Sequence, residues 1–207
     1  MEFMKLEDAI KKIRKTKERK FNQTIDLIVN LKKFDVKKTQ INFFITLPNK
    51  IKDKRICGFI EVKTDLINTI PKSSFIKYKN KKELKSLVKK YDFFISSGAN
   101  MPSVATTFGR VLGPAGKMPS PKLGILANES KEEIIKLIEK INSVVRIQTK
   151  EPSIKIKIGT EKMEDKAIID NLKTAHNAIV NELPKGKENI KSVIIKLTMG
   201  KPIKIDV

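Results

Sequence analysis

The chain has 207 residues, 40% of them hydrophobic, which is enough apolar material for one large or two small cores. It carries 44 lysines and arginines against 23 acidic residues, a formal net charge of +21. A soluble domain needs a net charge of only about 2 to 8, so this excess favours a polyanionic partner over a merely solvating lysine surface.

The titratable residues offer no catalytic arrangement. The single cysteine, Cys57, lies in an apolar run, which excludes a disulfide framework and a cysteine-based zinc site and indicates a reducing compartment. The single histidine, His176, has apolar neighbours in a helical pattern, so a packed side chain is favoured over a catalytic base. We therefore expect no enzyme activity, no bound metal and no cofactor.

The sequence also shows no targeting signal and no membrane-spanning segment. No apolar run reaches the roughly 18 to 20 residues that a membrane-spanning helix requires, and the first residues do not resemble a signal peptide. The sequence predicts a cytoplasmic protein without a membrane partner.

The first segments alternate between two periodicities. Residues 5–20 place apolar side chains at helical spacing among lysines and arginines, which predicts a basic amphipathic helix. Residues 24–31 alternate with period two and predict a strand. Residues 41–47 predict a second strand, which Pro48 stops.

The middle of the chain has a different pattern, in which short apolar runs alternate with helical stretches. This alternation implies a mostly parallel sheet covered by helices. Residues 108–119 are rich in glycine and proline and predict a rigid loop. We expect strands at residues 55–62, 75–78, 91–96 and 124–127, and helices at residues 82–90 and 131–141.

Period-two patterns return towards the C-terminus. Residues 144–149 and 154–158 flank a turn and predict a hairpin. A helix is expected over residues 166–183, followed by strands at 192–198 and 203–207.

These patterns predict two domains, because the outer thirds resemble each other and the middle differs. An α+β domain is expected from residues 1–50 and 144–207, interrupted by an inserted α/β domain of residues 51–143. The two crossings near residues 50 and 144 make a natural hinge.

The glycine-rich passage invites comparison with a phosphate-binding loop, and it does not fit. Val111 stands where the Walker motif requires glycine, and Met118 stands where it requires the Mg²⁺-binding serine or threonine. A rigid loop is favoured, in which Arg110 and Lys117 are possible secondary RNA contacts. A nucleotide-binding α/β enzyme that uses the middle domain stays as the weaker alternative.

Two segments favour RNA binding. A basic run ends at Lys20 and is followed by Phe21 and Thr24 at the entrance of a strand, although a solvated helix end would also explain the charges. Near the C-terminus, a strand stops at the uncharged tripeptide Thr198-Met199-Gly200, where glycine permits close approach of a nucleic-acid backbone. If the two strands are adjacent, the segments form one surface.

Four stretches carry a resemblance to a known family: residues 20–26, Leu47-Pro48, residues 112–119 and residues 197–200. Over nearly its whole length the chain resembles the large-subunit ribosomal protein L-one family, whose members build the lateral stalk beside the exit site of transfer RNA. Its sequence resembles archaeal or eukaryotic members more than bacterial ones. The resemblance implies a split β-α-β domain, made from both termini, and an inserted three-layer, Rossmann-like domain.

The resemblance also implies RNA-contacting residues and partners. The chain departs from the family at Gln23, where an acidic residue is frequent, at Ala115, where a basic residue is common, and at Lys201, which separates Gly200 from the usual proline. The expected partners are large-subunit ribosomal RNA (rRNA), transfer RNA at the exit site and the protein's own messenger RNA, bound by a protein that is monomeric when free. A charge-driven nucleic-acid chaperone is a further alternative. The predicted RNA-binding residues are Lys20, Phe21, Thr24, Ser192, Thr198, Met199 and Gly200.

Overall fold

The computed structural model describes residues 4–15, 19–36, 38–39, 41–149 and 151–206. The chain divides into two compact units. Unit 1 consists of Met1–Ile51 and Ser143–Val207, and unit 2 of Lys52–Asn142.

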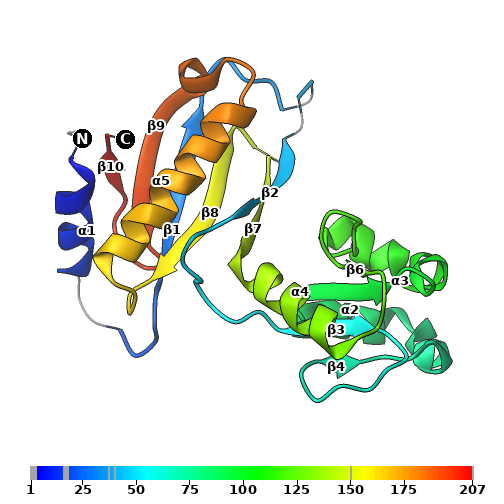
Figure 1. Cartoon of the computed structure of the whole chain (residues 1–207). Coiled ribbons are helices and arrows are strands. Elements are labelled where there is room, and N and C mark those ends of the chain that lie inside the picture. The colour runs from blue at the N-terminus through cyan, green and yellow to red at the C-terminus, as the bar shows by residue number, and fades with distance from the viewer. Residues whose placement is uncertain (1–3, 16–18, 37, 40, 150, 207) are drawn as a thin grey trace. The chain divides into compact units, whose positions relative to one another are not determined.

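Unit 1 is built on a four-stranded antiparallel sheet with the strand order β10-β9-β1-β8 (Figure 1). The helix α5 (Asp165–Glu182) connects β8 to β9, and a short 3-10 helix, η2 (Gly186–Asn189), precedes β9. Because β1 lies between β8 and β9, the unit has the predicted split β-α-β topology. The strands are β1 (Thr24–Leu31), β8 (Ser153–Thr160), β9 (Ile190–Leu197) and β10 (Ile203–Ile205).

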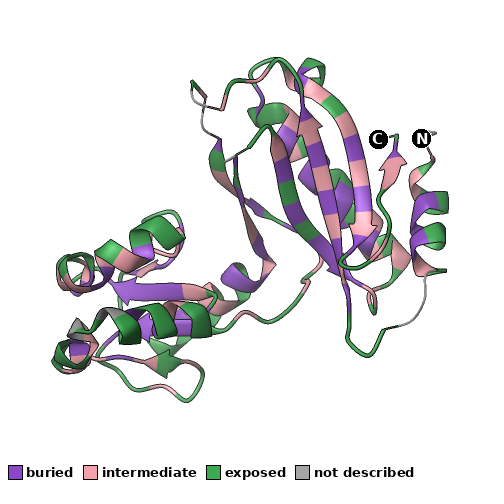
Figure 2. Ribbon diagram, turned by 180° about the vertical axis from the view of Figure 1, so that it is seen from behind, coloured by how far each residue is buried: buried purple, intermediate pink, exposed green. Residues whose placement is uncertain are grey.

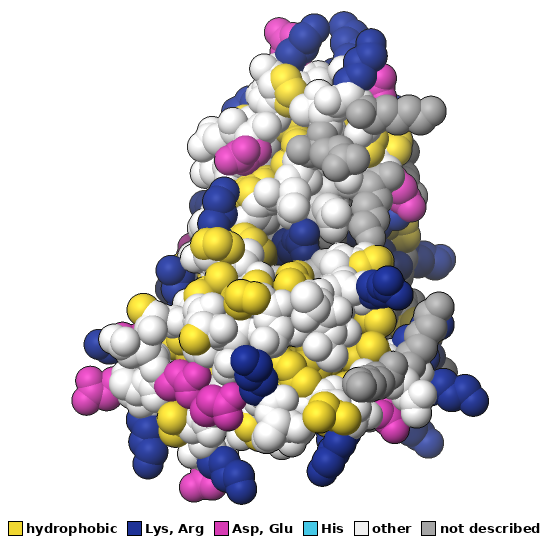
Figure 3. All heavy atoms as spheres, turned by 90° about the vertical axis from the view of Figure 1, so that its right-hand side faces the viewer, with side chains coloured by type: hydrophobic (Ala, Val, Ile, Leu, Met, Phe, Trp, Pro, Cys, Tyr) yellow, Lys and Arg dark blue, Asp and Glu magenta, His cyan; other side chains and the backbone are white. Residues whose placement is uncertain are grey.

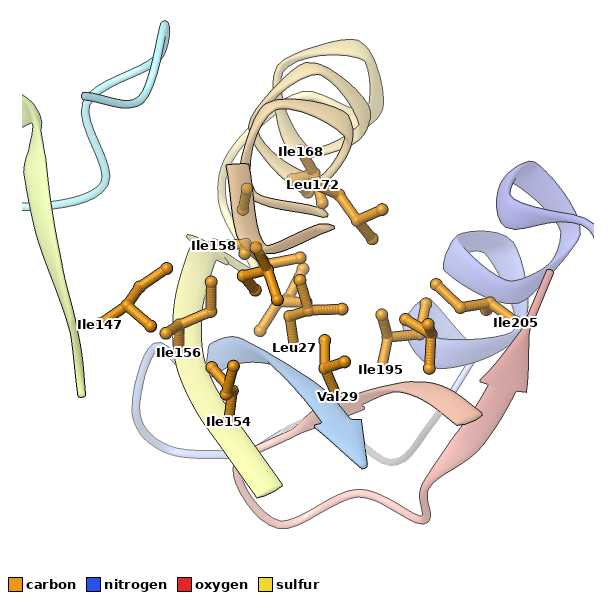
Figure 4. Close-up of a cluster of buried hydrophobic side chains, with 14 of the residues drawn as sticks. Leu27, Val29, Ile147, Ile154, Ile156, Ile158, Ile168, Leu172, Ile195 and Ile205 are labelled. Atoms are coloured by element: carbon orange, nitrogen blue, oxygen red, sulfur yellow. The ribbon is translucent and has the colours of Figure 1, made fainter. Parts of the chain in front are cut away.

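The two faces of this sheet differ. Alternate residues of β1, from Ile25 to Leu31, are buried in the core with α5 and with the N-terminal helix α1 (Leu6–Arg14), as Figure 4 shows for part of the cluster. The residues between them, Thr24 to Asn30, are only half-buried. Figure 2 shows this alternation as bands along the strands. We call the second face the open face of the sheet.

The predicted hairpin is wrong. Strand β7 (Val144–Gln148) pairs with β2 (Asn42–Thr46) in a separate two-stranded sheet, whereas β8 pairs with β1. Both strands have the expected alternation, but alternation specifies which face is buried and not which strand is the partner.

Buried amide groups anchor the two crossings, each within its own unit. In unit 1, the Asn171 side chain donates to the carbonyl oxygens of Asn49 and Ile158, both at 2.9 Å, and accepts a hydrogen bond from the Asn49 N–H at 2.9 Å. In unit 2, the Asn142 side chain accepts a hydrogen bond from the Lys54 N–H at 2.9 Å. The Lys54 ammonium donates to the Ile141 carbonyl, and burial lowers its pKa.

Unit 2 is the predicted three-layer α/β structure. Its four strands pair in parallel in the order β4-β3-β5-β6, with α4 (Lys131–Ser143) on one face and α2 (Lys81–Lys90) on the other (Figure 1). The rings of Phe59, Phe94 and Phe108 pack together in the layer under α2. The strands are β3 (Ile56–Phe59), β4 (Asn68–Thr69), β5 (Phe93–Ser97) and β6 (Ile125–Leu126).

Two predictions for unit 2 are wrong. The expected strand at residues 75–78 belongs to a 3-10 helix, η1 (Lys72–Lys79), whose Phe75 packs edge-on against Phe59 and Phe108. The expected loop begins inside the helix α3 (Met101–Ala115), which ends at Gly116 with φ 68°. Val104, Phe108 and Leu112 recur every four residues and are fully buried, so apolar packing outweighs the low helix propensity of the glycines and of Pro114.

Candidate nucleic-acid interface

The two predicted RNA-binding segments meet at one end of the unit 1 sheet. The Thr198 N–H donates to the Thr24 carbonyl oxygen at 3.0 Å, which continues the β1–β9 ladder one position beyond the Ile25–Leu197 pair. The two hydroxyl oxygens lie 2.9 Å apart, and the Thr24 N–H donates to the Thr198 hydroxyl at 3.2 Å. This pair is at the surface, so the sheet presents two oriented hydroxyl groups at its end.

The buried side-chain amide of Gln23 fixes the position of Met199, the residue that follows Thr198. The Gln23 side chain is only 2% exposed, and its oxygen accepts a hydrogen bond from the Met199 N–H at 3.3 Å. The Gln23 main chain is itself held, because its carbonyl oxygen accepts from the Glu161 N–H at 2.9 Å. Sequence reasoning noted Gln23 as a departure from the family but did not predict that it supports Met199. The signal was its place two residues before Ile25, on the inward-facing side of the strand.

The tripeptide makes a tight turn with an apolar side chain outside. Met199 is 62% exposed, and Phe21, before β1, is 52% exposed. The Gly200 N–H donates to the Leu197 carbonyl oxygen at 2.9 Å, and a Cβ atom on Gly200 would lie 3.1 Å from the Leu197 Cβ. Such a distance is tighter than nearly all contacts of this kind, so the turn favours glycine. We call Thr24, Thr198, Met199 and Gly200 the tip.

Ser192 lies at the opposite end of β9 from the tip. Its hydroxyl accepts a hydrogen bond from the Asn30 amide at 3.0 Å, across the register pair that these two residues form. Residues 192 and 198 lie on the same face, because alternate positions of a strand point the same way, and at about 3.3 Å per residue they are roughly 20 Å apart. The predicted site therefore extends along the open face.

Lysines accompany this face. Lys155 and Lys157 are exposed on β8 and Lys196 is half-buried on β9, and all three alternate with inward-facing apolar residues. Lys20, just before Phe21, is also exposed. Arg14 contributes differently, because its guanidinium forms an ion pair with Asp165 at 2.6 Å and donates to the Glu161 carbonyl oxygen at 2.7 Å.

The two predicted secondary contacts belong to unit 2. Arg110 is exposed on α3. The Lys117 ammonium, in contrast, donates to the carbonyl oxygens of Val88 and Tyr91, at 2.7 and 2.8 Å, at the C-terminal end of α2. There it offsets the partial negative charge of the helix end, so its bonds serve the fold of unit 2.

The isolated titratable residues are packed into the cores. Burial raises the pKa of the Cys57 thiol to about 12 and lowers the pKa of His176. Within the described ranges, no group of three or more histidine, cysteine, aspartate and glutamate side chains is arranged to hold a metal ion. No helix in the described part of the chain is long and apolar enough to cross a membrane.

Comparison with known proteins places this chain in a family. Residues 13–201 match the Ribosomal protein L1p/L10e family. Three relatives are each named Large ribosomal subunit protein uL1. The one from Nanoarchaeum equitans is 36% identical, over 96% of this chain and 98% of its own length. The one from Methanothermococcus thermolithotrophicus is 34% identical, over 96% of each chain. The one from Thermococcus kodakarensis is 33% identical, over 98% of this chain and 97% of its own length. The chain belongs to the Ribosomal protein L1p/L10e family.

Proposed function

We propose that this protein is a non-enzymatic structural constituent of the large ribosomal subunit, and that unit 1 binds the rRNA of the lateral stalk through the tip and the open face. The observation that carries the proposal is the meeting of Thr24 with Thr198 at an exposed sheet end. The relatives named Large ribosomal subunit protein uL1 supply the class of partner.

The chemistry of the surface suits folded RNA. Hydroxyl groups donate to phosphate oxygens, and they both donate to and accept from the 2′-hydroxyl groups that distinguish RNA from DNA. The turn at Gly200 permits close approach of a backbone. The half-exposed Met199 and Phe21 provide apolar surface for unstacked bases. The lysines of the open face add attraction that depends on salt rather than on sequence. Shape and hydrogen bonding then select the RNA, and charge strengthens its binding.

The finer roles are proposed from the resemblance to the ribosomal protein family. Unit 2 adds its own basic surface, and the stalk that carries the protein moves with the release of deacylated transfer RNA from the exit site. The same surface on unit 1 also accommodates a similar structure in the protein's own messenger RNA, which would repress translation. In this proposal the protein is located in the cytoplasm. It is a monomer when free and acts as a part of the ribosome.

The direct test is co-sedimentation of the protein with large ribosomal subunits in high salt. We expect wild-type protein to remain bound and to resist competition by an excess of unrelated duplex DNA. A charge-driven chaperone would instead be released by salt and by duplex DNA alike, and that result would refute the proposal.

A further inference from the structure

A cavity of about 730 Å³ lies within unit 1 behind the tip, between α1 and the turn that joins β9 to β10. Two tip residues, Met199 and Gly200, form part of its wall, and the buried Gln23 forms another part. The cavity therefore adjoins the surface on which the proposed function depends. Its size falls within the range of pockets that enclose small ligands, about 300 to 1,000 Å³.

The wall of this cavity combines apolar and cationic groups. Met4, Met199 and Ile203 keep accessible apolar surface and form its floor, above the buried Ile13 and Leu197. Among the described residues that line it there is no aspartate or glutamate, so its charge has one sign. The cationic lining residues are Lys12, Lys15, Arg19, Lys201 and Lys204.

The cations come from both sides of the cavity. Lys12 is exposed on α1, and Lys201 is exposed in the turn after Gly200. Arg14, on the same helix, is engaged with Asp165 and is not among the lining residues. A ligand between the two sides would be phosphorylated or otherwise anionic, with an apolar part to cover the aliphatic floor.

We propose that this cavity takes one unpaired nucleotide of the RNA that binds the tip, with its base on the floor formed by Met4, Met199 and Ile203 and its flanking phosphates near Lys12 and Lys201. The inference rests on the proposed function. It adds a specific subsite and gives a role to Lys201, which follows the Thr-Met-Gly tripeptide in this chain. A nucleotide fits because it joins a flat apolar base to an anionic phosphodiester.

The experiment measures affinity for a stalk rRNA fragment at several salt concentrations, using two neighbouring substitutions on α1. Lys12→Gln removes a lining cation, whereas Lys11→Gln removes the same charge from an exposed residue that does not line the cavity. We expect Lys12→Gln to weaken binding about fivefold at low salt and Lys11→Gln less than about twofold. The slope of log affinity against log salt should fall by about 1 for Lys12→Gln alone.

The proposed contact between the cavity and an RNA base is tested by changing the RNA. Each unpaired nucleotide of the fragment is replaced in turn by an abasic one, and affinities are measured for wild-type, Lys12→Gln and Lys11→Gln proteins. We expect one abasic position whose effect is smaller in the Lys12→Gln background and unchanged in the Lys11→Gln background, because groups in contact are not additive. Adenosine 5′-monophosphate alone should bind at least about a hundredfold more weakly than the fragment, since it lacks the tip contacts.

Equal effects of the two lysine substitutions, or absence of any coupled abasic position, would each overturn the subsite. These results differ from failure of the proposed function, in which wild-type protein would not bind the fragment selectively at all. If Thr198→Ala weakens binding while Lys12→Gln and Lys11→Gln behave alike, the interface stands and the cavity is not part of it.

Discussion

The hydroxyl oxygens of Thr24 and Thr198 lie 2.9 Å apart although 174 positions separate the two residues in sequence. Their meeting requires the chain to leave unit 1 after β2, complete unit 2 and return to pair β9 with β1. A surface made in this way exists only when unit 1 is folded, so we expect the proposed RNA binding to be linked to the folding of unit 1.

We expect Thr198→Ala to weaken binding of a stalk rRNA fragment by about 1 to 3 kcal/mol, because a hydroxyl held by Thr24 is lost at the interface. Filter binding or calorimetry would measure the loss. Thr198→Ser keeps the hydroxyl and should retain most of the affinity. Lys136→Ala, an exposed change on α4, should have little effect. Equal losses for Thr198→Ala and Lys136→Ala would place the interface elsewhere.

Substitution of Lys117 should affect stability rather than RNA binding. Lys117→Met removes the donor to the carbonyl oxygens of Val88 and Tyr91, and we expect a loss of about 1 to 3 kcal/mol in the unfolding free energy of unit 2. Arg110→Met, an exposed change in the same unit, is the control for loss of a charge. Urea denaturation measures the stability, and binding is measured well below the transition. A large loss of RNA affinity without a loss of stability would show that Lys117 contacts RNA directly.

Asn171 anchors the first crossing between the units, so its substitution should strongly lower the stability of unit 1. This side chain is fully buried and makes hydrogen bonds with Asn49 and Ile158, so Asn171→Ala leaves buried polar groups without partners. We expect unit 1 to lose about 2 to 4 kcal/mol of stability. Asn181→Ala, at an exposed position of the same helix, should change stability by less than about 0.5 kcal/mol. Similar denaturation midpoints for the two variants would contradict this role.

His176 predicts a pH dependence of stability. Burial, followed by the charge of Lys187, lowers the pKa of its imidazole below the ordinary 6.5. Between 6.5 and the lower pKa, the unfolded chain binds a proton that the folded chain does not, so stability from this group is complete above 6.5 and decreases as the pH falls. His176→Gln should remove this part of the dependence, seen as a smaller change in denaturation midpoint between pH 7 and pH 5. An unchanged dependence in the variant would refute the assignment.

Much of unit 1 could be predicted from the sequence because period-two alternation marks β1 and β9 and a continuous stripe marks α5. Strand partners could not be predicted locally. The pairing of β7 with β2 rather than β8 depends on tertiary packing, which the alternation within residues 144–158 does not encode. In unit 2, glycine and proline around residue 110 concealed the stripe of Val104, Phe108 and Leu112 that forms α3.

In the candidate site, too, some features could be predicted from the local sequence and others depend on tertiary packing. Phe21, Thr24 and the Thr198-Met199-Gly200 turn were identifiable from residue types and from resemblance. The support given by Gln23 was not, because a buried glutamine that accepts from the Met199 N–H is recognisable only once β1 and β9 are adjacent. Lys117 shows the converse: a basic residue in a glycine-rich passage indicated phosphate contact, whereas its donors are directed to main-chain carbonyl groups of unit 2.

Photocrosslinking from the exposed ring at position 21 tests the proposed interface most directly. Phe21→p-azidophenylalanine nearly preserves the shape of a side chain that is 52% exposed, and the same group at Ile76, which is 70% exposed in unit 2, is the matched control. With the protein bound to large ribosomal subunits, we predict crosslinks from position 21 to the stalk rRNA and few or none from position 76. Crosslinks to that RNA mainly from position 76, or from neither position, would contradict the assignment of the interface to unit 1.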